Sequence, residues 1–472
     1  MLFNSWEFLI FFVLVYGVYC TLNVRGQNVL LLVTSYVFYG WWDWRFLGLM
    51  LMSTAIDYCA GLMMEHSDER RRKIWLWVSV GANLTSLGVF KYFNFFIDSA
   101  RVALETLGFE AHLPVLSIIL PVGISFYTFQ TMAYTIDVYR RQMDVVRDPV
   151  LFGVYVSYFP QLVAGPIERA QNLIPQFIKP RRVTTEMITS GATLVLIGLV
   201  RKVIIADMVA SEVDAAFANP AAMSSAGLVR ATVLFALQIY GDFAGYSDIA
   251  RGTSRMMGIE LMRNFEHPYF STSITIFWRR WHISLSSWLR DYLYVPLGGN
   301  KGPSWFVYRN LLLTMLLGGL WHGAAWTFVV WGALHGASLA LHKLTLRDQK
   351  PPMKPKLDSA SDFARAIGGW ALTMALVLLT WIFFRATDLS NAMDVIGGIF
   401  DLRGGLGLSS WAMPVGVIAL MLFIDIPQYV TGDHTIMRRW PWPVRALIFT
   451  GLILAMVLLR SNEDVPFLYF QF

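Results

Sequence analysis

The chain has 472 residues, of which 56% are hydrophobic and only 15% are charged, whereas ordinary globular proteins carry about 25% charged residues. Apolar residues recur in blocks along the whole length, which excludes a soluble cytoplasmic enzyme, a disordered regulator and a disulfide-built secreted domain. The net charge of +6 resides in short basic clusters between apolar runs, a pattern that indicates the cytoplasmic loops of a membrane protein rather than a nucleic-acid surface.

Apolar segments follow one another along the chain and predict an all-α polytopic membrane protein, because a membrane-spanning helix needs about 20 apolar residues. The segments lie near residues 5–24, 27–44, 45–64, 74–97, 115–138, 190–209, 228–250, 367–384, 411–431 and 445–460. Two further apolar regions, 150–165 and 310–342, are interrupted by Gly, Pro and polar residues and predict re-entrant hairpins or short helix pairs. We therefore expect about 10–12 transmembrane helices plus re-entrant and interfacial helices, in a single membrane domain over residues 1–472.

Basic residues in the connecting segments predict the orientation, because cytoplasmic loops are enriched in Lys and Arg. The segments expected inside are 70–73, 140–147, 179–182, 251–309, 343–365 and 438–445, and those expected outside are 98–113 and 210–227. This alternation places both termini outside only if region 310–342 enters and leaves the membrane from the same side. The cysteines, Cys20 and Cys59, lie in apolar stretches and are expected to be small buried hydrophobic residues.

Ionisable residues at membrane depth are costly unless they are paired, so they are candidates for function. Asp242 and Asp248 belong to the sequence YGDFAGYSD, with Arg251 and Arg255 close behind. These residues predict either a structural network of ion pairs or the polar wall of a substrate passage.

A segment rich in Arg and Trp follows, with the sequence FWRRWHISLSSWLRD over residues 277–291. It is typical of a helix that lies at the inner membrane interface, and this amphipathic role alone is one interpretation. The other is that it binds a phosphate-bearing donor, because Arg forms bidentate contacts with phosphate. The residues that support this second interpretation are Asn264, the three arginines Arg279, Arg280 and Arg290, and two histidines, His267 and His282.

His322 lies in the sequence GGLWHGAAW, directly after Trp321 and between apolar runs. A lone histidine of this kind is either a hydrogen-bonded core residue or a general base, since its unperturbed pKa of about 6.5 suits proton transfer. His335 and His342 lack the spacing of a helical metal site, so no metal is expected. The sequence contains no GxSxG motif, P-loop or dinucleotide-binding motif, which excludes serine-hydrolase and nucleotide-binding chemistry of those kinds.

At these residues the chain resembles the membrane-bound O-acyltransferase family, in the bacterial branch that O-acetylates exported polysaccharide such as alginate or cellulose. The matching motifs are QLVAGPI at 161–167, DFAGYSD at 242–248, FWRRWHISLSSWLRDYLYVPLGG at 277–299 and WHG at 321–323. The long third motif is the most specific, and the resemblance covers most of the chain.

The resemblance implies a tunnel through a helical body in a bacterial inner membrane, with a catalytic core at about 150–345. A cytoplasmic thioester, acetyl-CoA, would be the donor and no cofactor would stay bound, while an extracytoplasmic acetyltransferase would be the partner. His322 would be the general base and His282 a second catalytic histidine. Donor binding would involve Arg279, Arg280, Asn264 and Trp278, and the tunnel wall Asp242, Asp248, Trp321 and Gln161.

The chain ends in FLYFQF at 467–472, which resembles the F-x-Y-x-x-F tail of a partner peptide used by the related D-alanyl transferase of teichoic acid. The resemblance implies that Tyr469 accepts the acetyl group and relays it, whereas the alternative is an ordinary aromatic belt at the membrane interface.

Three other functions also compete with the expected acetyl transfer. A transporter or flippase often has broken helices in both halves, but the first half of this chain has no counterpart of 264–326. An enzyme that acylates lipid, sterol or protein is a further alternative, and a purely structural scaffold would not need such costly polarity.

Overall fold

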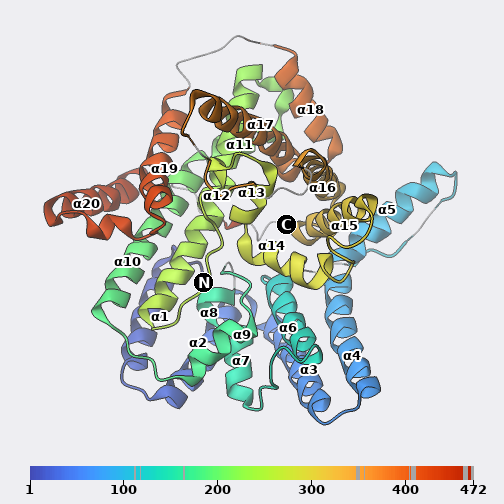
Figure 1. Ribbon diagram of the computed structural model, residues 1–472, viewed down its shortest axis with the longest axis vertical. Coiled ribbons are helices and arrows are strands. Elements are labelled where there is room, and N and C mark those ends of the chain that lie inside the picture. Colours follow the sequence, from blue (N-terminus) through green and yellow to red (C-terminus); the bar gives the residue numbers. More distant parts are fainter. Residues whose placement is uncertain are drawn as a thin grey trace. The chain divides into compact units, whose positions relative to one another are not determined.

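The structure is a computed structural model that describes residues 1–110, 113–116, 119–162, 165–346, 351–355, 357–402, 404, 411–460 and 466–468. Within these ranges all regular secondary structure is helical, which confirms the predicted all-α fold class (Figure 1). The chain divides into two compact units, here called unit 1 (residues 1–188 and 253–261) and unit 2 (residues 189–252 and 262–472). The single membrane domain over the whole chain stays a prediction.

Four α-helices of unit 1 begin after residues whose side chains accept a hydrogen bond from the first turn, namely Ser5, Asn23, Asp68 and Asp148. These residue types are preferred there because the first N–H groups of a helix have no partner within it. The helices of unit 1 are α1 (Trp6–Tyr19), α2 (Val24–Asp43), η1 (Trp44–Phe46), α3 (Leu47–Glu65), α4 (Glu69–Leu87), the π-helical η2 (Gly88–Tyr92), α5 (Phe93–Thr106), α6 (Ile124–Tyr139), α7 (Pro149–Ser157), α8 (Phe159–Leu162) and α9 (Ala170–Ile178).

The remaining helices lie wholly or mostly in unit 2. They are α10 (Thr185–Val200), the π-helical η3 (Arg201–Asp207), α11 (Met208–Ala218), η4 (Pro220–Ala222), α12 (Ser225–Met256), η5 (Pro268–Phe270), α13 (Ile274–Arg280), α14 (Ile283–Leu289), the π-helical η6 (Arg290–Tyr294), α15 (Ser304–His322), α16 (Trp326–Leu346), α17 (Ala360–Arg385), α18 (Leu389–Phe400), α19 (Ala412–Thr431), η8 (Ile436–Arg439) and α20 (Trp442–Leu459).

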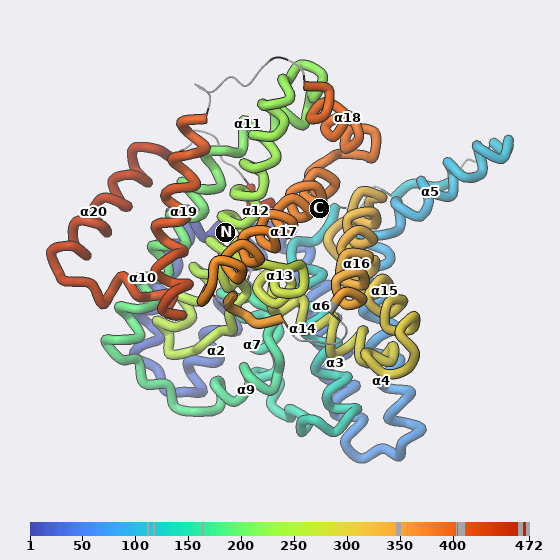
Figure 2. Tube along the Cα trace, turned by 45° about the horizontal axis from the view of Figure 1, so that its top comes forward, coloured from blue at the N-terminus to red at the C-terminus, as the bar shows by residue number. Residues whose placement is uncertain are grey.

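Helices α15 and α16 lie side by side as an antiparallel hairpin (Figure 2). A Cβ atom on Gly319 would lie 2.2 Å from the carbonyl oxygen of Phe328, and one on Gly332 would lie 2.3 Å from that of Met315. Such distances leave no room for any side chain, so glycine permits the close approach of the two backbones. The region 310–342 is therefore a helix pair that places His322 beside the turn. Its helices, of 19 and 21 residues, are longer than the short pair that the sequence predicts.

A second close helix contact in unit 2 brings α12 against α10 and η3. A Cβ atom on Gly245 would lie 2.7 Å from the carbonyl oxygen of Gly198, and one on Gly241 would lie 2.9 Å from that of Arg201. Gly241 and Gly245 form a G-x-x-x-G pair, a spacing that lets helix backbones approach closely within membranes. The polar residues of α12 consequently lie next to Arg201 and Lys202 of η3.

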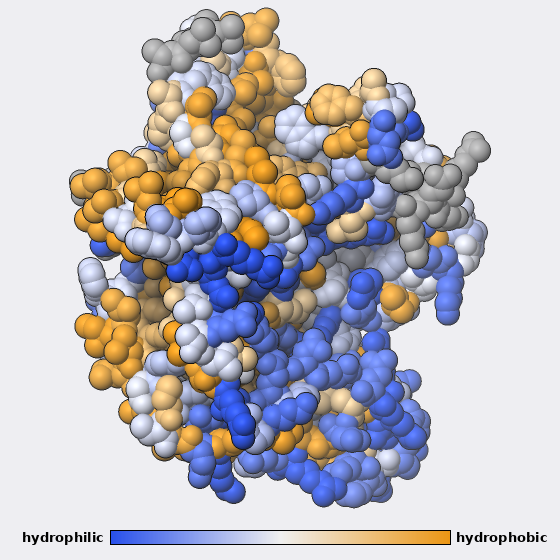
Figure 3. All heavy atoms as spheres, turned by 60° about the vertical axis from the view of Figure 1, so that its left-hand side comes forward, coloured by the Kyte–Doolittle hydropathy of each residue, from blue (hydrophilic) through white to orange (hydrophobic). Residues whose placement is uncertain are grey.

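Four stretches of the described residues are long and apolar enough to cross a membrane: Val24–Glu65, Ala360–Arg385, Ala412–Thr431 and Trp442–Leu459. The other predicted segments also form helices, but these are shorter or carry more charge, and 10–12 crossings stays a prediction. Apolar and hydrophilic residues gather in separate areas of one face (Figure 3). Cys20 and Cys59 are exposed rather than buried, which corrects the expectation, because a small apolar side chain also suits a surface that contacts lipid.

Candidate active site

His322 is the last residue of α15, and only 3% of its surface is exposed. The ring centroids of Trp321 and Trp331 each lie 5.1 Å from the imidazole, and that of Phe384 lies 5.3 Å away. These rings come from α15, α16 and α17, so three helices enclose the histidine. The enclosure limits the access of bulk water to the imidazole.

His282 connects α13 to α14 and is fully buried. Its backbone has φ of +41°, a left-handed conformation that is uncommon for residues other than glycine and typically costs about 1–3 kcal/mol. Asn264 holds the start of α14: its carbonyl oxygen accepts from the Ile283 N–H at 2.9 Å, and its Oδ1 accepts from the Ser284 Oγ at 2.7 Å. These two hydrogen bonds therefore hold the strained connection between α13 and α14 in one orientation.

The two histidines expected to be catalytic come together in unit 2, with ring centroids 6.3 Å apart. The ring of Trp321 lies 5.8 Å from His282, and that of Phe243 lies 4.6 Å from it. Burial lowers the pKa of His282 to about 3, so this imidazole is neutral at pH 7. A neutral imidazole can donate one hydrogen bond and accept another, but it does not contribute a positive charge.

The side-chain amide of Asn264 has its nitrogen buried beside this connection. Within the described part of the chain Nδ2 has no hydrogen-bond partner, although Oδ1 is bonded to Ser284. Leaving a buried amide donor unsatisfied typically costs about 1–3 kcal/mol. This orphaned donor is suited to a bound acceptor atom.

His335 is a third buried histidine of the same region, which from the sequence is considered only as a metal ligand. Its Nδ1 accepts from the Nε1–H of Trp278 at 3.2 Å, so its Nε2 carries the proton and donates to the Thr380 Oγ1 at 3.0 Å. Both nitrogens are thus used in joining α13, α16 and α17. His335 is suited to hold Trp278 and not to transfer protons.

A cavity of about 750 Å³ lies among α13, α14, η6, α15 and α16. Its wall includes three cationic side chains, Arg279, Arg290 and Lys343, together with the indole of Trp278. Arg290 pairs with Asp291 at 2.7 Å, and Arg279 donates to the carbonyl oxygen of Pro351 at 3.4 Å. The positive charges are suited to the phosphates of a ligand.

Aromatic rings connect this cavity with the buried histidines. Trp278, on the cavity wall, packs on Trp331 with ring centroids 5.6 Å apart, and Trp331 in turn packs on His322. Ile283, which also lines the cavity, directly follows His282 in the chain. The cationic cavity and the histidine pair are therefore neighbouring parts of unit 2.

Arg280 points to different surroundings from its neighbour Arg279 and is not part of the described cavity wall. It is 3% exposed, donates to the carbonyl oxygen of Met353, and lies 5.0 Å from the ring centroid of Tyr429. Sequence reasoning had placed both arginines at one donor site, and the helical turn between adjacent residues separates their side chains. Donor binding by either residue stays a prediction.

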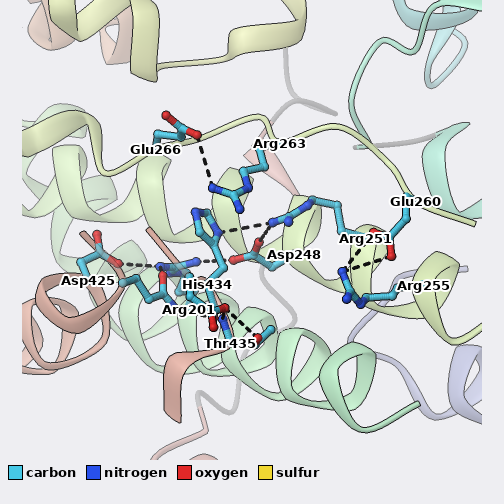
Figure 4. Close-up of polar contacts among 12 residues, drawn as sticks. Arg201, Asp248, Arg251, Arg255, Glu260, Arg263, Glu266, Asp425, His434 and Thr435 are labelled. Carbon is cyan, nitrogen blue, oxygen red and sulfur yellow. Dashed lines mark hydrogen bonds and ion pairs between the residues drawn. The ribbon is translucent and has the colours of Figure 1, made fainter. Parts of the chain in front are cut away.

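Arg201 is the centre of a fully buried network of charges (Figure 4). Its guanidinium donates to the carboxylates of Asp248 and Asp425, the latter at 2.5 Å. Asp248 also accepts from Arg251 at 2.9 Å, as the sequence predicts, whereas Arg255 pairs with Glu260 at 3.1 Å. The pairing of Asp248 with Arg201 and Arg251 supports the interpretation of Asp248 as part of a structural network of ion pairs.

Lys202, the next residue, forms a second buried cluster. Its ammonium group lies 2.7 Å from the Asp207 carboxylate and 2.8 Å from that of Asp242. The sequence did contain a signal for both clusters, because Arg201, Lys202 and Asp425 are charged residues inside predicted apolar segments. The tunnel-wall role of Asp242, Asp248 and Trp321 stays a prediction.

Gln161 lies in unit 1, where its Nε2 donates to the Oε1 of Gln130 at 2.7 Å. The other predicted site residues that the structure describes belong to unit 2. Tyr469 is outside the described residues, which end at Leu468 in this region.

Comparison with known proteins identifies the family. Residues 147–387 match the membrane-bound O-acyltransferase family, a stretch that includes His282 and His322. The chain belongs to this family. It is a multi-pass membrane O-acyltransferase, and α19, α20 and the C-terminal segment lie beyond the matched residues of the family.

Three similar proteins cover between 56% and 100% of this O-acyltransferase. A protein named probable alginate O-acetylase from Pseudomonas putida is 39% identical over all of both chains. The peptidoglycan O-acetyltransferase of Helicobacter pylori is 34% identical over 82% of this chain and 77% of its own. The teichoic acid D-alanyltransferase of Streptococcus thermophilus is 28% identical over 56% of this chain and 67% of its own.

Proposed function

We propose that this enzyme moves acetyl groups from acetyl-CoA in the cytoplasm across the bacterial inner membrane, for O-acetylation of an exported polysaccharide such as alginate or cellulose. The observation that carries the proposal is the buried pair of His282 and His322 beside a cavity lined by three cations. Relatives named as acetylating alginate and peptidoglycan support the choice of acyl group and of acceptor class.

In the proposed reaction a hydroxyl oxygen of the acceptor attacks the carbonyl carbon of the thioester. His322 takes the hydroxyl proton while the new C–O bond forms, as a general base. The C–S bond then breaks, and the proton passes from His322 to the departing thiolate. The products are an O-acetyl ester and free coenzyme A, so no oxidant or further reactant is needed.

Negative charge develops on the carbonyl oxygen during this attack and needs hydrogen-bond donors. Neutral His282 is one candidate, and the orphaned Nδ2 of Asn264 is the other. Donors that are fixed in advance at such a position lower the barrier because they need no reorganisation. The left-handed turn at His282 and the Asn264 hydrogen bonds provide that fixed geometry.

The proposed first acceptor is Tyr469, which would relay the acetyl group to an extracytoplasmic acetyltransferase. A phenol has a pKa of about 10. Its ester therefore keeps more transfer potential than the ester of a sugar hydroxyl. The second transfer, from the aryl ester to the polysaccharide, is then favourable and requires no new energy source outside the cytoplasm.

We expect purified enzyme in lipid nanodiscs to take up label from radiolabelled acetyl-CoA and to carry it on Tyr469. Peptide mass spectrometry locates the label, and Tyr469→Phe abolishes it because no hydroxyl remains. Phe470→Leu is the matched control in the same tail and retains the label. Label on another residue, or on none while coenzyme A is still released, contradicts the relay but not the acyltransferase.

Neutralising two cations of the cavity should weaken donor binding. For the Arg279→Gln/Lys343→Gln double variant we expect the KM for acetyl-CoA to rise about 10- to 100-fold, because charge-assisted hydrogen bonds to phosphate contribute about 1.5–3 kcal/mol each and these side chains are partly exposed. The kcat should change less than about threefold. Steady-state kinetics measure both, and Arg365→Gln, an exposed cation paired with Asp362, is the control. An unchanged KM would place the donor elsewhere.

A further inference from the structure

The last described residues of the chain return to the interior of unit 2. Phe467 is fully buried and Leu468 is 4% exposed, although α20, which precedes them, is largely exposed. The ring of Phe467 packs 4.4 Å from that of Tyr246 and 6.0 Å from that of Phe243. These residues of α12 therefore form a seat for the C-terminal segment.

The backbone of this segment is bound to the buried charge cluster of Lys202. The Leu468 N–H donates to the Oδ2 of Asp242 at 2.7 Å, while the other oxygen of that carboxylate lies 2.8 Å from the Lys202 ammonium. Asp242 is 1% exposed and Lys202 is fully buried. A backbone amide thus completes a buried ionic site.

The charges explain why this site accepts an N–H donor. Lys202 forms ion pairs with two carboxylates, those of Asp207 and Asp242. The positive charge of Arg460 also stabilises the ionised form of Asp207. Among the described residues the partners of the Asp242 carboxylate are Lys202 and the Leu468 amide. Because Lys202 is shared with Asp207, the charge-assisted hydrogen bond from the Leu468 amide further stabilises the buried carboxylate of Asp242.

The seat lies next to the histidine pair. The Phe243 ring contacts both Phe467 and His282, with centroids 6.0 Å and 4.6 Å apart, respectively. The same aromatic side chain therefore contacts the bound segment and the candidate active site. Tyr469, the proposed acceptor, is the next residue in the sequence.

We propose that Asp242 is a positioning residue: its carboxylate, oriented by Lys202, binds the backbone N–H of Leu468 and so holds Phe467 and Leu468 at their seat on α12. In the relay of the proposed function this anchor positions the acyl acceptor that follows Leu468 in the sequence. This rests on the proposed function as far as the acetylation of Tyr469 is concerned. The anchoring of the segment does not depend on the proposed function. Hydrogen exchange tests the anchor, and the kinetics of acetyl transfer test the positioning role.

Leu468→Pro tests the anchor without changing the buried charges, because proline has no N–H to donate. Leu468→Ala is the matched control, since it removes more of the side chain than proline does but keeps the N–H. Hydrogen exchange followed by mass spectrometry measures how firmly the C-terminal peptide is seated. We expect exchange of that peptide to be at least about tenfold faster in Leu468→Pro than in Leu468→Ala.

A double-mutant cycle identifies the partner of the amide. Asp242→Ala should also accelerate exchange of the C-terminal peptide, and adding Leu468→Pro should accelerate it less than about threefold further, because both changes remove one hydrogen bond. Equal exchange in Leu468→Pro and Leu468→Ala, or fully multiplicative effects in the cycle, would overturn the anchor whatever the activity of the variants.

The positioning role has its own readout in the kinetics of acetyl transfer. In Leu468→Pro the kcat for acetylation of Tyr469 should fall about tenfold or more relative to Leu468→Ala, while the KM for acetyl-CoA changes less than about twofold. Faster exchange with an unchanged kcat would overturn the positioning role. Absence of acetyl-Tyr469 from the unmodified enzyme would refute the relay. The anchor would then still be tested by the hydrogen-exchange experiment.

Discussion

His322→Ala should lower the kcat of acetyl transfer about 10²- to 10⁴-fold, the range that a positioned general base contributes. The KM for acetyl-CoA should stay within about threefold, because the cations of the cavity are unaffected and His322 lies beyond Trp331 from the cavity wall. Single-turnover release of coenzyme A, measured with the purified variant in nanodiscs, separates the two quantities.

His66→Ala is the matched control for this substitution, since the His66 side chain is 84% exposed and lies in unit 1. It should retain the activity of the unmodified enzyme. Equal activity of the two variants would contradict the base role of His322. Binding of acetyl-CoA without any acetyl transfer by the unmodified enzyme would instead favour the transporter alternative.

Arg201→Met should destabilise the protein by about 3–5 kcal/mol, the usual cost of leaving a buried charge without its partner. The substitution deprives Asp425 of its guanidinium, whereas Asp248 keeps Arg251. Thermal unfolding in detergent, followed by size-exclusion chromatography, should show a strongly lowered midpoint and reduced yield of folded protein.

Two further variants give this prediction its controls. Arg201→Met leaves the Asp425 carboxylate with the His267 Nδ1 at 3.4 Å and the Tyr240 hydroxyl at 2.7 Å, but without its guanidinium. Arg201→Met/Asp425→Asn removes this carboxylate and should recover most of the lost stability, because the Asp248–Arg251 pair remains balanced. Arg255→Met breaks only a partly exposed pair with Glu260 and should cost less than about 1 kcal/mol. If the double variant is no more stable than Arg201→Met, unpaired charge is not the cause.

The length of the apolar segments was sufficient to predict many of the helices and the two interrupted regions, whereas α9, α11 and α18 lie largely or wholly outside the predicted segments. Each predicted apolar segment contains a helix, and region 150–165 is divided between α7 and α8 while region 310–342 forms the α15–α16 hairpin. The close contacts of Gly319 and Gly332 within this hairpin could not be predicted, because the partner carbonyl groups of Phe328 and Met315 are set by the tertiary fold.

Pairing across the chain could not be predicted in the same way. The sequence places Asp248 near Arg251, and that pair forms, but it does not show that Arg201 meets Asp425 or that Asp242 meets Lys202. Such partners depend on which helix faces are packed together. The family motifs predicted that His282 and His322 are functional. They did not predict that the two rings lie 6.3 Å apart, which depends on the packing of α13, α14 and α15.

The length of α15 limits which donors can react. Leu311 and Met315 of this helix line the cationic cavity, and His322 ends it, so 7 to 11 helical residues separate the cavity wall from the imidazole. At about 1.5 Å per residue this is roughly 10–17 Å along the axis. Under the proposed function, this distance favours an acyl group carried on a long, thin arm over a compact activated acetate such as acetyl phosphate. Discrimination between donors would then depend on the reach of the carrier and hardly at all on the acyl group.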